Sequence, residues 1–478
     1  MKLLIISNTK NSLFIRLIYH FFQVNNLVAI SISIGINIWL YYFGFYKGYE
    51  IFDILISIFL LFTLFSILLG KYIDLSLFLF FLSFPLVNFL IFKSQPVGIV
   101  IFGVLINWTL IHMIIIIYKF RYIPKIRFHF NLVTITVIFI IIFSSIFSIT
   151  NSLQSYVALN SILYGFILPI FIYYYFRNRA ITKNFLDDFL DISILSFVIL
   201  NLVFISFALL GLIGVDIYDS RYSGFVNSPN TFAPWALIIL SFIFMRIKQN
   251  KFSLLYLFSM VFTIFLILLT GTRAALILMS LILMYFTVFK NLTSIFSIIK
   301  WILYFSLFYL VLTFIVNDVM DLLVFQRYVE YGFSSGRIEI WKQSIEYISS
   351  KNYYFYGTGM GNFLFSTYST IGRSTPHNSI LNLAVSIGLI SSVLYHVFIV
   401  SHLINNKSSR ASFDYKFIIL IILAYMVFET FEPMYFDRQD PALFLVNDIM
   451  INSMNTNIYV ILSWAILGIS SKVRSNSE

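Results

Sequence analysis

The fold of this chain is decided by the stretch Leu269-Thr270-Gly271-Thr272-Arg273-Ala274-Ala275, which separates two apolar runs with almost no loop. The runs cover about 252–271 and 273–289, and each has the ~20 residues with which a helix crosses a ~30 Å hydrocarbon core. A turn this short predicts two membrane helices that run in opposite directions. The charged head of Arg273 must then lie at or just inside the interface, where a charge is costly unless something pairs with it.

The composition of the whole chain indicates the same class of protein. Of its 478 residues, 60% are hydrophobic and only 11% are charged. A single soluble globule could not bury so much apolar surface, so the chain is predicted to be a polytopic membrane protein. Nothing alternates with the short period of a membrane β-barrel. The lack of cysteine excludes structural disulfides and cysteine-ligated metal.

Apolar runs of spanning length recur along the chain and predict an all-α bundle of about 12–14 transmembrane helices. They lie at about 26–45, 51–69, 75–92, 97–118, 131–149, 157–176, 191–213, 231–247, 252–271, 273–289, 296–316, 378–403, 415–432 and 457–471. One polytopic domain, 1–478, is therefore expected. Its longest polar interval is the loop 317–377.

The net charge of +11 indicates orientation in the bilayer rather than nucleic-acid binding, because lysine and arginine gather on cytoplasmic loops. With the N-terminus inside, every strongly basic short loop falls on one side. These loops include Lys119, Arg121, Arg177, Arg179, Arg246, Lys248, Lys407 and Arg410. Both termini are therefore predicted to be cytoplasmic. The segments 214–230, 317–377 and 433–456 are predicted to lie outside, and no nucleic-acid partner is expected.

Several arginines lie on the outward side, where this charge rule does not place them. They are Arg221, Arg273, Arg327, Arg337 and Arg373. A guanidinium offers a planar fork of donors that matches phosphate oxygens, so arginines converging on one cavity would bind a lipid-linked phosphate. The alternative for each is a snorkelling or salt-bridged side chain, with Glu330, Glu339 and Glu346 as available partners.

The outward loop contains a predicted amphipathic helix and a candidate base. The helix starts at Ser335-Gly336-Arg337, carries apolar residues at 338, 341 and 345, and would present Arg337 near its positive N-terminal end. The pattern Gly357-x-Gly359-x-Gly361 permits close backbone approach without the spacing of a dinucleotide or Walker loop. His377 directly precedes the next apolar run, either as a proton acceptor for a hydroxyl group or as a polar helix cap.

Four stretches, in this order, resemble the bacterial O-antigen ligase and polysaccharide-repeat polymerase superfamily. They are Arg221 to Asn230, Leu268 to Ala275, Gly336 to Asn362, and Pro376-His377-Asn378 continuing to Gly388. Ten residues separate His377 from Gly388, like the His-x10-Gly pattern of that family. The resemblance covers about 220–390, which is the expected catalytic core. It departs at Arg221, which lacks the companion Arg-x10-Gly pattern, and at 272–274, where Thr-Arg-Ala stands in place of Ser-Arg-Gly.

The resemblance implies a GT-C-like glycosyltransferase that works on undecaprenyl-diphosphate-linked glycans outside the cytoplasmic membrane of a bacterium. Arg221, Arg273 and Arg337 would bind the diphosphate, and His377 would orient or deprotonate the attacking hydroxyl. The further expected substrate contacts are Arg327, Tyr328, Trp341 and Asn378. No cofactor and no metal is required. Besides the bilayer, a chain-length regulator and a flippase of the same pathway are the expected partners.

Different functions remain open at this point. A polymerase joins repeat units into O-antigen, capsule or exopolysaccharide, whereas a ligase transfers the finished glycan to lipid A core or a protein, and the motifs serve both. The polymerase is preferred because each individual glycan locus has one. A lipid-linked oligosaccharide flippase would carry charges along mid-membrane helices and show related halves. The sequence shows few central charges and no evident repeat.

Overall fold

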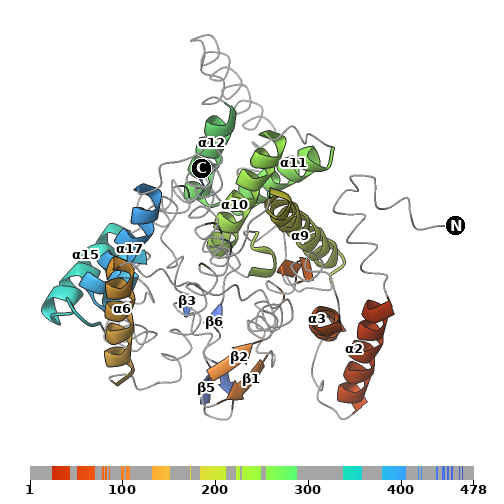
Figure 1. Ribbon diagram of the computed structural model, residues 1–478, viewed down its shortest axis with the longest axis horizontal. Coiled ribbons are helices and arrows are strands. Elements are labelled where there is room, and N and C mark those ends of the chain that lie inside the picture. Colours follow the sequence, from red (N-terminus) through yellow and green to blue (C-terminus); the bar gives the residue numbers. More distant parts are fainter. Residues whose placement is uncertain are drawn as a thin grey trace, which may run out of the picture.

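The protein is mainly α-helical in the parts that the structure describes (Figure 1). The computed structural model describes residues 24–42, 51–69, 98–101, 104–107, 132–150, 183–211, 222–226, 229–248, 254–287, 337–357 and 379–404. Shorter pieces and single positions are described within 78–86, at 173 and within 418–466. The helical class predicted from the sequence is confirmed for these residues, apart from three short strand pairs.

Most of the described helices follow the predicted apolar runs. They are α2 (Val24–Tyr42), α3 (Ile51–Leu69), α6 (Leu132–Thr150), α9 (Lys183–Leu209), α10 (Pro229–Lys248), α11 (Leu254–Leu269), α12 (Arg273–Thr287), α15 (Arg337–Ser350), α16 (Ser379–Ile387) and α17 (Leu389–Ile404). A short 3-10 helix, η3 (Gly224–Val226), precedes α10. The helix α9 begins well before the predicted 191 because its acidic residues find a partner on α10, as described below.

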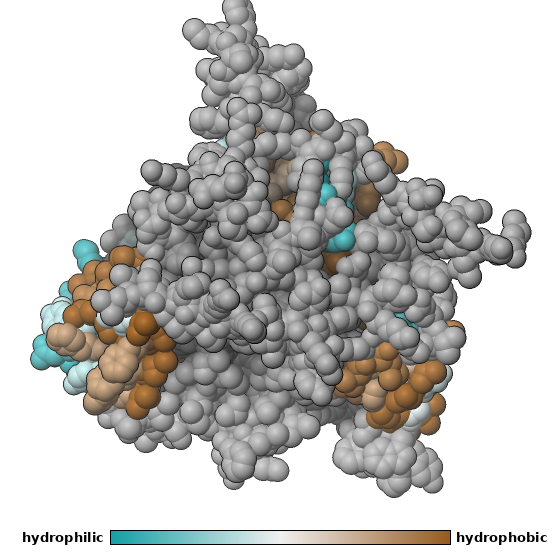
Figure 2. All heavy atoms as spheres, in the orientation of Figure 1, coloured by the Kyte–Doolittle hydropathy of each residue, from teal (hydrophilic) through white to brown (hydrophobic). Residues whose placement is uncertain are grey.

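Apolar surface is exposed on several of the described helices. Large apolar side chains are exposed along α2 and α6, up to 64% for Ile38 and 65% for Phe139. Figure 2 shows them as brown areas at the places of these helices. One described segment, 186–209, is by itself long and apolar enough to cross a membrane. The fold is thus consistent with a membrane bundle, and the number of crossings stays a prediction.

Strands replace the start of one predicted span. At 97–118 a helix was expected, but β1 (Gly98–Ile101) and β2 (Val104–Asn107) form an antiparallel pair. The sequence prediction is wrong there because β-branched valine and isoleucine favour strands, and the glycines at 98 and 103 disfavour a helix. Two more antiparallel pairs lie in the acidic segment 433–456. They are β3 (Arg438–Gln439) with β6 (Met454–Asn455), and β4 (Phe444–Val446) with β5 (Ile449–Ile451).

Helices α9 to α12 form one packed group, with α10 at its centre. Figure 1 shows α9, α10 and α11 side by side, and α10 also contacts α12. From Phe232 to Met245 every residue of α10 is buried. A helix that is apolar on all sides is normally buried by its neighbours, as this one is. The helix begins at Pro229, which has the fixed φ that suits a first helical position.

A second group consists of α6, α15, α16 and α17, of which α6, α15 and α17 are labelled close together in Figure 1. The single span expected at 378–403 is wrong, because the chain bends at Gly388 (φ +95°) between α16 and α17. The Ser392 hydroxyl donates to the Ile380 carbonyl over 2.7 Å. In a straight helix, residues twelve positions apart lie ~18 Å apart, so α17 folds back against α16. With nine residues, α16 is too short to cross a bilayer.

Candidate functional site

Two of the four motif stretches are held together by the first helix group. The backbone N–H of Tyr222 donates to the Leu269 carbonyl over 3.0 Å. Tyr222 directly follows Arg221, and Leu269 ends α11 four residues before Arg273. The segment before α10 and the turn before α12 therefore lie against each other, as two parts of one site would.

The turn between α11 and α12 is built from local caps. Gly271 takes a positive φ of 58° that other residues rarely adopt. The Thr270 hydroxyl donates to the Ile267 carbonyl over 2.7 Å and accepts the Thr272 N–H over 3.2 Å. The Leu276 N–H donates to the Thr272 carbonyl, which starts α12 at Arg273. A helix N-terminus is electropositive, so a negative charge would stabilise the start of α12. Arg273 therefore does not serve to stabilise this helix.

Tyr222 anchors the segment beside Arg221. It is buried, and its hydroxyl donates to Asn201 Oδ1 over 2.7 Å, while the Asn201 amide donates to the Phe197 carbonyl. The Tyr222 ring meets Phe204 and Phe232 edge to face, with centroids 5.6 and 5.1 Å away. Burial raises the pKa of Tyr222 well above 10, so the hydroxyl keeps its proton and stays a donor at any physiological pH.

Replacing Tyr222 with phenylalanine should therefore destabilise the protein by about 1–3 kcal/mol, because the buried Asn201 oxygen loses its donor. Thermal unfolding in detergent measures this loss. Tyr354→Phe is the control, since the Tyr354 side chain is 40% exposed. If both variants unfold at the wild-type temperature, the hydroxyl does not hold this segment.

The predicted helix of the outward loop exists, and α15 begins at Arg337 as expected. Its buried face differs from the predicted one at 338, 341 and 345. Ile345 is 54% exposed, whereas Ser344 and Ile348 are buried and Trp341 is partly buried. The spacing 341, 344 and 348 also follows one helix face, and tertiary packing of Ile348 against Ala384 and Val385 selects it.

Trp341 lies on this inner face of α15, and its indole Nε1 is buried with no hydrogen-bond partner among the described residues. Indole N–H groups usually find a partner when buried. The structure describes the side chain of Trp341, but only the backbones of Arg273 and Arg337. A role of Trp341 in stacking on a sugar beside these arginines stays a prediction.

The glycine pattern does bring backbones together, as predicted, at Gly357. A Cβ on Gly357 would lie 2.1 Å from the Val385 carbonyl oxygen of α16. A Cβ on Gly388 would lie 2.6 Å from the Phe355 carbonyl carbon. The N–H groups of Leu389 and Ile390 donate to the carbonyls of Tyr353 and Tyr354. The chain after α15 is thus inserted at the bend between α16 and α17.

Several predicted site residues lie outside the described residues. They are His377, Asn378, Arg221, Arg327 and Tyr328. The helix α16 begins at Ser379, two residues after His377, and the role of His377 stays a prediction. The convergence of Arg221, Arg273 and Arg337 on one cavity stays a prediction. Within the described residues no group of three or more His, Asp or Glu side chains could hold a metal ion.

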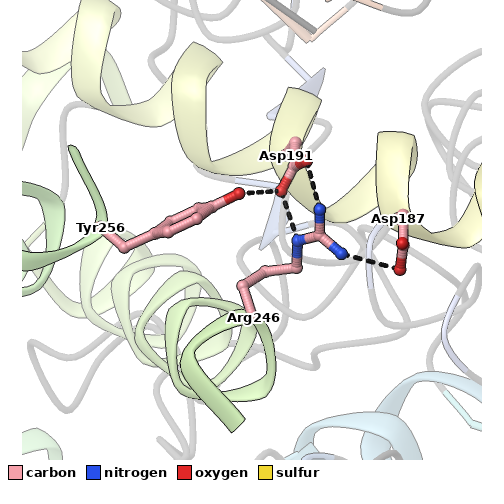
Figure 3. Close-up of polar contacts among 4 residues, drawn as sticks. All are labelled: Asp187, Asp191, Arg246 and Tyr256. Carbon is pink, nitrogen blue, oxygen red and sulfur yellow. Dashed lines mark hydrogen bonds and ion pairs between the residues drawn. The ribbon is translucent and has the colours of Figure 1, made fainter. Parts of the chain in front are cut away.

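An ion-pair network that the sequence analysis missed lies in the first helix group (Figure 3). Arg246 of α10 is only 1% exposed and forms two hydrogen bonds with Asp191 of α9, the Nε–Oδ1 distance being 2.6 Å. Its Nη1 is 2.7 Å from Asp187 Oδ1, and the Tyr256 hydroxyl of α11 donates to Asp191. Arg246 is therefore not a loop charge. Two acids four residues apart at the start of α9 were the sequence signal that could have indicated this ion-pair network.

One comparison with known proteins gives a match. Residues 258–396 match a family model described as O-antigen ligase. The matched segment starts in α11 and ends in α17, and it contains Arg273, Arg337 and His377, whereas Arg221 precedes it. Neither the curated proteins nor the solved structures include a match to this chain. The resemblance recognised in the sequence is confirmed for this segment.

Proposed function

We propose that this chain polymerises undecaprenyl-diphosphate-linked oligosaccharide repeat units into a surface polysaccharide. The match of residues 258–396 to the O-antigen ligase family model supports glycosyl transfer from a lipid-linked glycan, and the choice of a polymerase is part of the proposal. The reaction takes place at the outer face of a bacterial cytoplasmic membrane, which the chain crosses several times with both termini inside. The segment 220–390 is the proposed GT-C-like catalytic core, and a flippase and a chain-length regulator are its proposed pathway partners.

The chemistry is a transfer of a glycosyl group from a lipid-linked diphosphate to an acceptor hydroxyl group. The acceptor hydroxyl of one repeat unit forms a new bond to the anomeric carbon of the lipid-linked glycan. The bond from that carbon to the diphosphate breaks, and the electron pair leaves with the undecaprenyl diphosphate. The hydroxyl proton passes to a base, so atoms and charges balance without a cofactor.

In this proposal the arginines stabilise the charge that develops on the leaving diphosphate. Arg273 and Arg337 are each the first residue of a helix, α12 and α15, where the helix dipole also favours a negative group. Arg221 adds a third cation next to the anchored Tyr222. His377 accepts the hydroxyl proton near neutral pH. Arg327, Tyr328, Trp341 and Asn378 are the proposed contacts to the rest of the substrate.

A ligase is the second candidate, because the matched family model is described by that name, and the match does not distinguish a ligase from a polymerase. A ligase would use the same donor, the same diphosphate-binding arginines and the same base. Its acceptor would be lipid A core or a protein in place of another repeat unit. The two functions differ in the product, which a test with defined acceptors separates.

The test uses purified protein with undecaprenyl-diphosphate-linked repeat units as the sole substrate. Wild type should produce a ladder of longer lipid-linked glycans. Arg337→Ala and Arg273→Ala should each lower the rate about 100-fold or more, since one donor to a developing charge is worth ~3 kcal/mol. His377→Ala should lower the rate by a similar factor, because a positioned general base contributes about 100-fold or more. Lys342→Ala is the matched control, because Lys342 is an exposed cation on the same helix as Arg337 and should keep the wild-type rate.

The other outcomes are equally informative. Glycan transfer that requires lipid A core or a protein acceptor would replace the polymerase with the ligase. A wild-type protein that transfers to no acceptor would contradict both, and transport of the lipid-linked glycan across vesicles would then indicate a flippase. A loss with Lys342→Ala as large as with Arg337→Ala would mean that general basicity, and not a defined arginine, is needed.

A further inference from the structure

Ser392 makes a hydrogen bond between two helices, unlike three other buried helix serines that the structure describes. In a helix a serine commonly donates to the carbonyl four residues before it. Ser193, Ser241 and Ser259 do so, with distances of 2.8 to 2.9 Å. Ser392 is fully buried in the first turn of α17, and its hydroxyl donates instead to the Ile380 carbonyl of α16 over 2.7 Å.

This hydrogen bond reaches the first turn of α16. Ile380 is the second residue of that helix, and the helix begins two residues after His377. An isolated helix of nine residues is marginal in water, and its N-terminal turn lacks part of its backbone hydrogen bonds. The hydrogen bond from Ser392 adds to the packing of this short helix against α6, α15 and α17.

A second buried serine in the same turn bonds to a different helix. The Ser392 N–H donates to the Gly388 carbonyl, so Ser392 lies in the turn that follows the bend. The neighbouring Ser391 hydroxyl is 2.7 Å from the Ser144 hydroxyl of α6, which also donates to the Phe355 carbonyl. Because the Ser392 hydroxyl bonds to α16 and the Ser391 hydroxyl to α6, Ser391 is a matched control for the contact with α16.

We propose that Ser392 is a positioning residue for the transfer reaction: its hydroxyl holds the Ile380 carbonyl and so fixes the start of α16, to which His377 is attached. The inference rests on the proposed function of His377. Catalysis depends on placement, and an error of ~1 Å from a change far from the chemistry lowers a rate by up to ~100-fold.

The experiment compares Ser392→Ala, Ser392→Thr and Ser391→Ala in the polymerisation or ligation assay with purified full-length protein. Ser392→Ala should lower kcat about 10-fold or more with an unchanged KM for the lipid-linked donor, because placement and not binding is impaired. Ser392→Thr keeps a hydroxyl at this position and should restore most of kcat. Ser391→Ala, which is equally buried but bonded to α6, should keep kcat close to wild type.

Amide hydrogen exchange of residues 379–387 gives a readout that does not depend on activity. Exchange there should rise in Ser392→Ala and not in Ser391→Ala. Wild-type kcat in Ser392→Ala would overturn this inference alone, as would equal losses in Ser392→Ala and Ser391→Ala. A wild-type protein without any transfer activity, or a fully active His377→Ala variant, would overturn the proposed role of His377 and this inference with it.

Discussion

Arg246→Met should lower the free energy of unfolding by about 3–5 kcal/mol, which is typical when one partner of a buried ion pair is removed. The wild-type guanidinium serves Asp187 and Asp191 at once, and it is almost inaccessible to solvent. Without it, two acids near the start of α9 lose their counter-charge. Thermal unfolding of the purified protein in detergent, followed by tryptophan fluorescence, measures the change.

The matched control removes all three charges together. In Arg246→Met combined with Asp187→Asn and Asp191→Asn no unpaired charge is left, and Tyr256 can still donate to an amide oxygen at position 191. Replacement of a whole buried ion pair is often close to neutral, so the triple variant should recover most of the lost stability. If the triple variant is no more stable than Arg246→Met, the loss comes from packing around α10 and not from unpaired charge.

Gly357→Ala should also be strongly destabilising, by about 3 kcal/mol or more, because the new methyl group overlaps with backbone that cannot move aside. Its Cβ would stand 2.1 Å from the Val385 carbonyl oxygen and 2.4 Å from the Ser386 carbonyl carbon. Relief of this overlap would require the segment after α15 to leave α16. Thermal unfolding and proteolysis of the segment 351–357 measure the effect.

Substitutions at three other glycines distinguish overlap with neighbouring atoms from backbone strain. Gly35 lies in α2 with nothing within 4 Å of a new Cβ, so Gly35→Ala should be neutral or stabilising. Gly211 has a positive φ and no atom within 4 Å of a new Cβ, so the stability lost in Gly211→Ala measures backbone strain alone. Gly388→Ala combines strain with overlap and should lose more stability than Gly211→Ala. Equal stability of Gly357→Ala and Gly35→Ala would mean that the segment after α15 does not pack against α16.

The candidate site was accessible from the sequence where the signals are local. The starts of α12 at Arg273 and of α15 at Arg337 follow from capping residues and glycine next to each arginine. The motif order across 220–390 also pointed to the family that the match at 258–396 confirms. In contrast, the buried face of α15 was misassigned, because more than one line of residues follows a helix face and only the packing of Ile348 selects among them.

By itself the sequence determined the helical character of the described residues, the boundaries of α3 and the start of α12, because apolar period, chain length and caps act between near neighbours. Only the tertiary structure decided that Arg246 is paired inside the bundle, that the run after His377 bends at Gly388, and that Gly357 touches α16. Each of these depends on residues far apart in the chain that meet only when helices pack. A local pattern contains no information on which distant backbone or charge will fill the neighbouring space.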